Sequence, residues 1–140
     1  MKILIIDGMG GGIGKALIEK IKTSPIRAEI IAVGTNAIAT TAMLKAGADY
    51  AATGENAVIY NAAMVDAILG VVGIAFANAM HGEVSPKMAK AISRSRAKKI
   101  LIPTDKCSVA VAGVAAAPMQ DYINEAIQIL QNNTGKEEAK

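Results

Sequence analysis

The chain begins with a short apolar run, residues 3–6, that leads directly into Asp-Gly-Met-Gly-Gly-Gly-Ile-Gly at residues 7–14. A segment of helical period follows at once, so the order predicts a strand, a tight turn and a helix. Glycine at five of the seven positions 8–14 permits positive φ angles and a close approach of the backbone to a ligand. Because the first turn of the helix directs unpaired N–H groups to the same place, this unit is typical of a phosphate-binding loop.

Apolar strand-like runs alternate with segments of helical period along the rest of the chain. This alternation predicts an α/β fold, a Rossmann-like three-layer sandwich with a mainly parallel sheet of five to six strands. The expected strands are residues 2–6, 29–33, 49–52, 66–70, 98–102 and, as a sixth, 108–112.

Helices are expected between these strands, at residues 12–22, 36–46 and 54–63. In the second of them, Ile38, Ala42, Met43 and Ala46 are predicted to face inward. Ser85 followed by Pro86 predicts an N-cap and the first residue of a helix that runs to about residue 95, and Pro118 marks another start. We expect a single domain over residues 1–131 and a flexible polar tail over residues 132–140.

Composition narrows the classes of function. The net charge of +3 comes from scattered basic residues, and aromatic residues make up only 3% of the chain, so a nucleic-acid partner is not expected. A single cysteine, Cys107, excludes an internal disulfide and a cysteine-rich metal site, and no metal is predicted. Since no apolar stretch is long enough for a signal peptide or a membrane span, we expect a cytoplasmic protein.

Spacing separates the phosphate-binding motifs that compete for the glycines. The triphosphatase loop requires glycine where Met9 stands and a hydroxyl where Ala16 stands. The Gly-x-Gly-x-x-Gly fingerprint that starts at Gly8 requires glycine where Ile13 stands. The pattern Gly-x-x-x-Gly-x-Gly is matched by Gly8, Gly12 and Gly14.

With this spacing, residues 2–21 resemble the cofactor loop of short-chain dehydrogenases/reductases, in which Thr-Gly-x-x-x-Gly-Ile-Gly opens the first helix. The resemblance implies that Gly8, Gly12, Ile13 and Gly14 contact NADP or NAD, and we extend the candidate site to the rest of the loop, Met9, Gly10 and Gly11. The carboxylate of Asp7 is a departure, because it repels a phosphate unless it points away, caps backbone N–H groups or holds a cation.

Residues that follow the other strands complete the candidate site, because ligands of open α/β sheets bind beyond the carboxyl ends of the strands. After the second strand, Thr35 and Asn36 offer small polar groups and no carboxylate, so a 2′-phosphate is at least as acceptable as a free ribose, although either residue also suits a helix N-cap. After the fourth strand, Gly70 and Gly73 are expected as further cofactor contacts, since the resembled superfamily has a glycine-containing loop beside the cofactor there.

Reductases of the resembled superfamily use a tyrosine followed four residues later by a lysine, which lowers the pKa of the tyrosine for proton transfer. No tyrosine of this chain is followed by lysine at that spacing, so reductase chemistry is not expected. Over its full length the chain is similar to a family of small bacterial proteins of unknown function, through its glycine-rich start and three further segments, residues 34–40, 52–56 and 100–103. That resemblance implies no activity.

Three functions therefore remain open. The first is a nucleotide-binding protein without reductase chemistry. The second is an enzyme acting on a phosphorylated metabolite through Asp7, His81, Asp105, Lys106 or Cys107. The third is a structural or oligomerisation module whose glycines serve packing alone. The apolar segment from Ile74 to Met80 predicts a homodimer contact.

Overall fold

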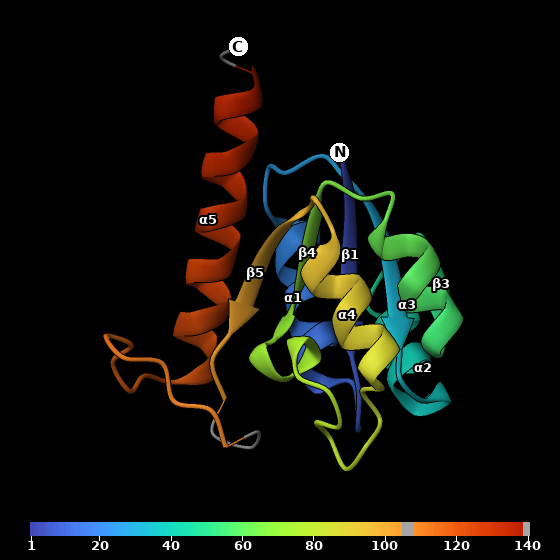
Figure 1. Ribbon diagram of the computed structural model, residues 1–140. Helices are drawn as coiled ribbons and strands as arrows, with labels where there is room; N and C mark the ends of the chain where they lie inside the picture. Colours follow the sequence, from blue (N-terminus) through green and yellow to red (C-terminus); the bar gives the residue numbers. More distant parts are fainter. Residues whose placement is uncertain (105–107, 139–140) are drawn as a thin grey trace.

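The computed structural model describes residues 1–104 and 108–138, with side chains described up to residue 134. Five parallel strands form one sheet in the order β3-β2-β1-β4-β5 (Figure 1). The strands are β1 (Lys2–Asp7), β2 (Glu29–Gly34), β3 (Tyr50–Thr53), β4 (Ala67–Val71) and β5 (Lys98–Ile102). The predicted Rossmann-like α/β fold is confirmed, with five strands.

Helices cover both faces of this sheet. The helices are α1 (Gly12–Thr23), α2 (Ala37–Lys45), α3 (Glu55–Ala62), the short 3-10 helix η1 (Val72–Ala75), α4 (Pro86–Arg94) and α5 (Met119–Glu138). Alternation along β1 sends Ile3 and Ile5 to the core under α1, α2 and α5, and Leu4 and Ile6 to the core under α3 and α4. The central strands β1 and β4 are thus buried on both faces, which explains their nearly continuous apolar sequences, whereas the edge strand β3 is partly exposed.

Capping residues set the helix boundaries much as the sequence predicts. The Oγ of Ser85 accepts a hydrogen bond from the Met88 amide at 3.2 Å, and Pro86 is the first residue of α4. The side chain of Asn36 accepts from the Ala39 amide at 2.9 Å and caps α2. The backbone reverses at Gly47, with φ of 116°, just beyond the end of α2.

Three local predictions differ from the structure. The predicted inward face of α2 is wrong at Ile38, which is 73% exposed, because Ala39 packs inward in its place, whereas Met43 is buried as predicted. Residues 108–112 form no strand; they lie beyond β5 and contribute nothing to the buried cores. The backbone of α5 stays helical to Glu138, into the segment predicted as a polar tail.

The order of the strands creates one topological switch point, between β1 and β4, where successive connections leave to opposite sides. The carboxyl ends of the strands point to the lower side of Figure 1, where the loop between η1 and α4 also lies. In the described part of the chain, no helix combines the length and apolar character needed to cross a membrane.

Candidate functional site

A cavity of about 1070 Å³ opens at this switch point. Its lining comes from the glycine loop, the end of β4, the loop before α4, the chain beyond β5 and the start of α5. The lining residues are Asp7, Gly8, Met9, Gly10, Gly11, Gly12, Ile13, Ala16, Val71, Gly73, Asn78, Ala79, Met80, His81, Thr104, Ser108, Met119 and Ile123. Lysine and arginine are missing from this described lining, so an anion bound here depends on backbone amides and the helix dipole.

Asp7 ends β1 with a carboxylate that is only 5% exposed. One oxygen accepts a hydrogen bond from the Gly8 amide at 2.8 Å, and the other accepts from the Gly14 amide at 2.7 Å. Burial raises the pKa of Asp7, and this effect exceeds the lowering by these amides. The carboxylate therefore caps the start of α1 from within, one of the arrangements that reconcile an acidic side chain with this loop.

The loop glycines fall into two structural groups. A Cβ atom on Gly8, Gly11 or Gly14 would lie 2.5–2.8 Å from a neighbouring atom, so a side chain at any of them would force a neighbour to shift, and at Gly11 that neighbour is backbone. A Cβ on Gly10 or Gly12 would meet nothing within 4 Å. Packing accounts for the first group only.

Hydrogen bonds divide the loop in the same way. The Gly8 and Gly14 amides donate to Asp7, and the Gly11 amide donates to the Gly8 carbonyl at 3.0 Å. Within the described part of the chain, the amides of Gly10 and Gly12 have no protein acceptor. Two free N–H groups thus stand beside open space at the beginning of α1, where a phosphate is best stabilised.

Glu83, from the loop before α4, accepts hydrogen bonds from the polar side chains that follow β2. Its carboxylate accepts hydrogen bonds from Thr35 Oγ1 at 2.9 Å and from Asn36 Nδ2 at 2.6 Å. A longer contact of 3.4 Å joins it to the Met9 amide. The hydrogen bond from Asn36 is the main reason why the pKa of Glu83 is lowered. The side chains of Thr35 and Asn36 are therefore hydrogen-bonded to the Glu83 carboxylate, and neither residue lines the cavity.

Backbone strain is concentrated around the cavity. Five non-glycine residues in the described chain have positive φ, namely Met9, Asn78, Met80, His81 and Ser108, and every one of them lines the cavity. Each such residue costs roughly 1–2 kcal/mol. Strain of this kind is typical of functional sites, where the surrounding structure holds the backbone in place.

The structure places most of the predicted site residues together. The cavity is lined by Gly8, Met9, Gly10, Gly11, Gly12, Ile13 and Gly73, whereas Gly14 does not line it and donates its amide to Asp7. Gly70 is buried in β4, where a Cβ would lie 2.6 Å from the Ile6 carbonyl oxygen. His81 lies at the cavity, while Asp105, Lys106 and Cys107 are outside the described residues.

The predicted dimer segment from Ile74 to Met80 is partly internal. Ile74 is fully buried in the core under α3 and α4, and Phe76 is 44% exposed. Ala79 and Met80 face the cavity. The only large apolar side chain that this segment exposes strongly is therefore Phe76.

Comparison with known proteins places the chain in a family. Residues 2–135 match the model of a domain of unknown function, DUF3842. The chain belongs to the DUF3842 family. No curated protein matches it in sequence.

The DUF3842 chain is similar in structure to a dodecameric FMN-dependent UbiX-like decarboxylase from Escherichia coli O157:H7. The TM-score is 0.51, with 15% sequence identity, over 96% of this chain and 95% of that chain. At this identity the likeness shows the fold alone, and it agrees with the parallel α/β architecture described above.

The two site carboxylates predict opposite pH effects on stability. The lowered pKa of Glu83 means that its stabilising contribution is present above pH 4.5 and is lost as the pH falls through its folded-state pKa. The pKa of Asp7 is raised from 3.8, so the folded protein takes up this proton more readily than the unfolded chain does. The contribution of Asp7 to the free energy of unfolding therefore increases as the pH falls through its folded-state pKa.

We expect Glu83→Gln to lower the free energy of unfolding at neutral pH by about 1 kcal/mol, because an amide replaces a charged acceptor. The difference from wild type should shrink as the pH falls below 4.5. Urea unfolding of the wild type and of Glu83→Gln, from neutral pH to below pH 4.5, measures this difference. A difference that stays constant with pH would show that the charge of Glu83 is unimportant.

Proposed function

We propose that this DUF3842 protein binds a mononucleotide-type cofactor, a phosphate ester with a planar ring such as FMN, in the cavity between β1 and β4. The proposal rests on Gly10 and Gly12, which line the cavity at the beginning of α1, have open space beside their Cα atoms and have amides without a protein acceptor in the described part of the chain. These two N–H groups and the helix dipole would hold the phosphate.

The remainder of the cavity suits a flat aromatic ring. Its walls carry the side chains of Met9, Met80 and Met119, together with Ile13 and Val71. Thioether and aliphatic groups pack well on aromatic faces, and methionine adapts to irregular shapes. Asn78 and His81 are among the polar residues of the lining that would orient such a ring.

The position of the cavity favours a mononucleotide over NADP or NAD. A dinucleotide extends across the switch point, with one half over the end of β2. No described residue of β2 or α2 lines the cavity, and Glu83 already occupies Thr35 and Asn36. A 2′-phosphate at that place would meet the Glu83 carboxylate, so NADP is the weaker candidate.

Two further observations bear on the alternatives. A glycine loop made only for packing explains Gly8, Gly11 and Gly14 but leaves Gly10 and Gly12 without a reason. The structural neighbour is FMN-dependent and dodecameric by its description, which supports FMN as the first ligand to test and self-association as a property to measure.

Thermal unfolding with a panel of ligands tests the proposal. We expect FMN to raise the unfolding temperature, because a ligand at 100 times its dissociation constant adds about 2.7 kcal/mol to the stability. NADP, NAD, ATP and coenzyme A should give smaller shifts. A larger shift with NADP would favour the dinucleotide, and no shift with any nucleotide would leave packing as the function of the loop.

A further inference from the structure

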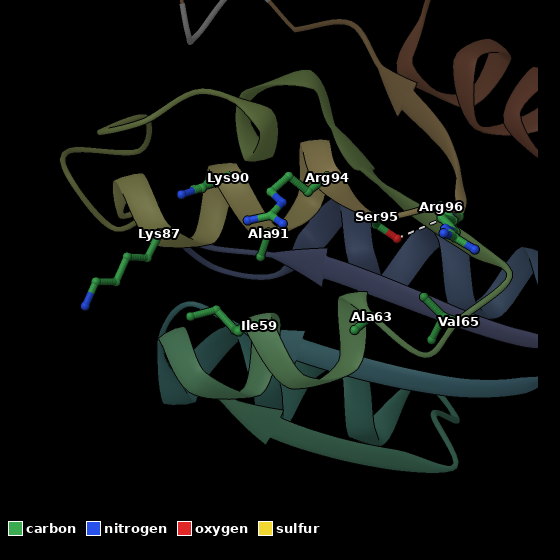
Figure 2. Close-up of a pocket in the computed structure, with 10 residues that line it drawn as sticks. Ile59, Ala63, Val65, Lys87, Lys90, Ala91, Arg94, Ser95 and Arg96 are labelled. Carbon is green, nitrogen blue, oxygen red and sulfur yellow. Dashed lines mark hydrogen bonds between the residues drawn. The ribbon is translucent and has the colours of Figure 1, made fainter.

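A second concave surface lies between α3 and α4 and shares no lining residue with the cofactor cavity. It is a groove of about 510 Å³ (Figure 2). Ile59 lies on α3, Ala63 directly follows it and Ala91 lies on α4. Figure 2 shows Ala91 directed toward α3 across the groove. Val65 and Ala97 extend this apolar floor toward the sheet.

An uncovered apolar surface adjoins the groove on the α3 side. On α3 and just beyond it, Ile59 is 37% exposed, Tyr60 is 63% exposed and Met64 is 48% exposed. Glu55 is the only charged residue of α3, and its carboxylate accepts a hydrogen bond from Ser85 Oγ at 2.5 Å. An exposed apolar area of this kind beside charged residues is typical of protein-binding surfaces.

The other side is basic. Lys87, Lys90 and Arg94 are spaced i, i+3 and i+7 on α4, which places them along one stripe of the helix, and Arg96 follows at its end. The two ion pairs found in the described chain, Lys15–Glu19 and Lys22–Asp49, lie elsewhere. These four cations therefore have no carboxylate partner among the described residues.

The groove is fixed by hydrogen bonds at one end. Ser95 Oγ donates to the Ala62 carbonyl at 2.5 Å and so joins the end of α4 to the end of α3. Lys99 Nζ donates to the Ser95 carbonyl beside it. A surface held in this way loses little conformational entropy when a partner binds.

We propose that the α3–α4 groove docks an acidic amphipathic helix from a partner protein. The apolar face of such a helix covers Ile59, Tyr60 and Met64, and its acidic residues pair with the stripe of Lys87, Lys90 and Arg94 on α4. Both halves of the surface are then used. A nucleic acid would engage mainly the cations and leave most of the apolar half in water, and of the residues that form this surface Tyr60 alone offers an aromatic ring for base stacking.

Fluorescence anisotropy tests this docking on the full chain. The probe is a labelled peptide of about 14 residues, roughly four helical turns, with leucine along one face and glutamate along the adjoining face. A scrambled peptide of the same composition, a single-stranded oligonucleotide and vesicles containing anionic lipid serve as competitors. We expect the amphipathic peptide to bind and the scrambled peptide to bind at least about tenfold more weakly.

Variants locate the binding on this surface. The double variant Lys90→Glu with Arg94→Glu should lower the affinity for the peptide by about tenfold or more. Ile59→Ser should also lower this affinity, although it leaves the net charge unchanged. Lys15→Glu with Lys45→Glu, in the groove between α1 and α2, is the matched control and should have no effect. The far-UV circular dichroism of each variant verifies its fold.

Three results would overturn the docking proposal. They are the absence of peptide binding, equal binding of the scrambled peptide, and preferential binding of the oligonucleotide or the vesicles. Equal weakening by the control pair would also overturn it, because binding would then follow net charge alone.

Discussion

Replacement of Gly11 by alanine is expected to lower the free energy of unfolding by about 3 kcal/mol. Gly11 has φ of 75°, which disfavours any side chain, and a Cβ there would lie 2.8 Å from the Ala39 Cα. The obstacle is the backbone of α2, which cannot move aside as a flexible side chain can. Urea unfolding at neutral pH measures the loss.

Gly12→Ala is the matched control for this change. Gly12 is the first residue of α1, and a Cβ there meets nothing within 4 Å. We expect its stability to equal that of the wild type or to exceed it by about 0.5 kcal/mol, since alanine reduces the entropy of the unfolded chain. Similar losses for the two variants would contradict the division of the loop into packing glycines and open glycines.

A large side chain at Gly12 is expected to remove cofactor binding while the fold persists. Gly12→Leu fills the space in front of the free amides and displaces the phosphate. The loss of two hydrogen bonds to a charged group is worth about 3 kcal/mol, or roughly a hundredfold in the dissociation constant for FMN. Isothermal titration calorimetry measures this change.

Ala37→Leu provides the control for the size of leucine. Ala37 is the exposed first residue of α2 and lies outside the cofactor cavity. FMN should bind this variant as it binds the wild type. Unchanged FMN affinity in Gly12→Leu would place the phosphate away from the loop.

The fold was largely predictable because the central strands β1 and β4 are apolar runs buried on both faces. The predicted start of α4 was also confirmed, since Ser85 and Pro86 act through local chemistry. On α2 the prediction was right at Met43 and wrong at Ile38, because the packing of Ala39 under Gly11 depends on tertiary contact between two helices. Hydrophobicity alone favours Ile38 at the core and gives no indication of that contact.

The candidate site was predictable only in part. The spacing of glycines located the loop, but it could not separate Gly11 from Gly12, because their neighbours come from distant segments. Glu83 was missed, since 48 residues separate it from Thr35 along the chain. Positive φ at Met80 and His81 also has no sequence signal beyond the adjacent Gly82.

The amide resonances of Gly10 and Gly12 report on the proposed phosphate contact. In a ¹H–¹⁵N NMR titration with FMN, both amide protons should move downfield as they form hydrogen bonds to the phosphate. The Gly8 and Gly14 amides, which already donate to Asp7, should move less. Binding of FMN that leaves the Gly10 and Gly12 resonances unchanged would contradict the proposed phosphate site.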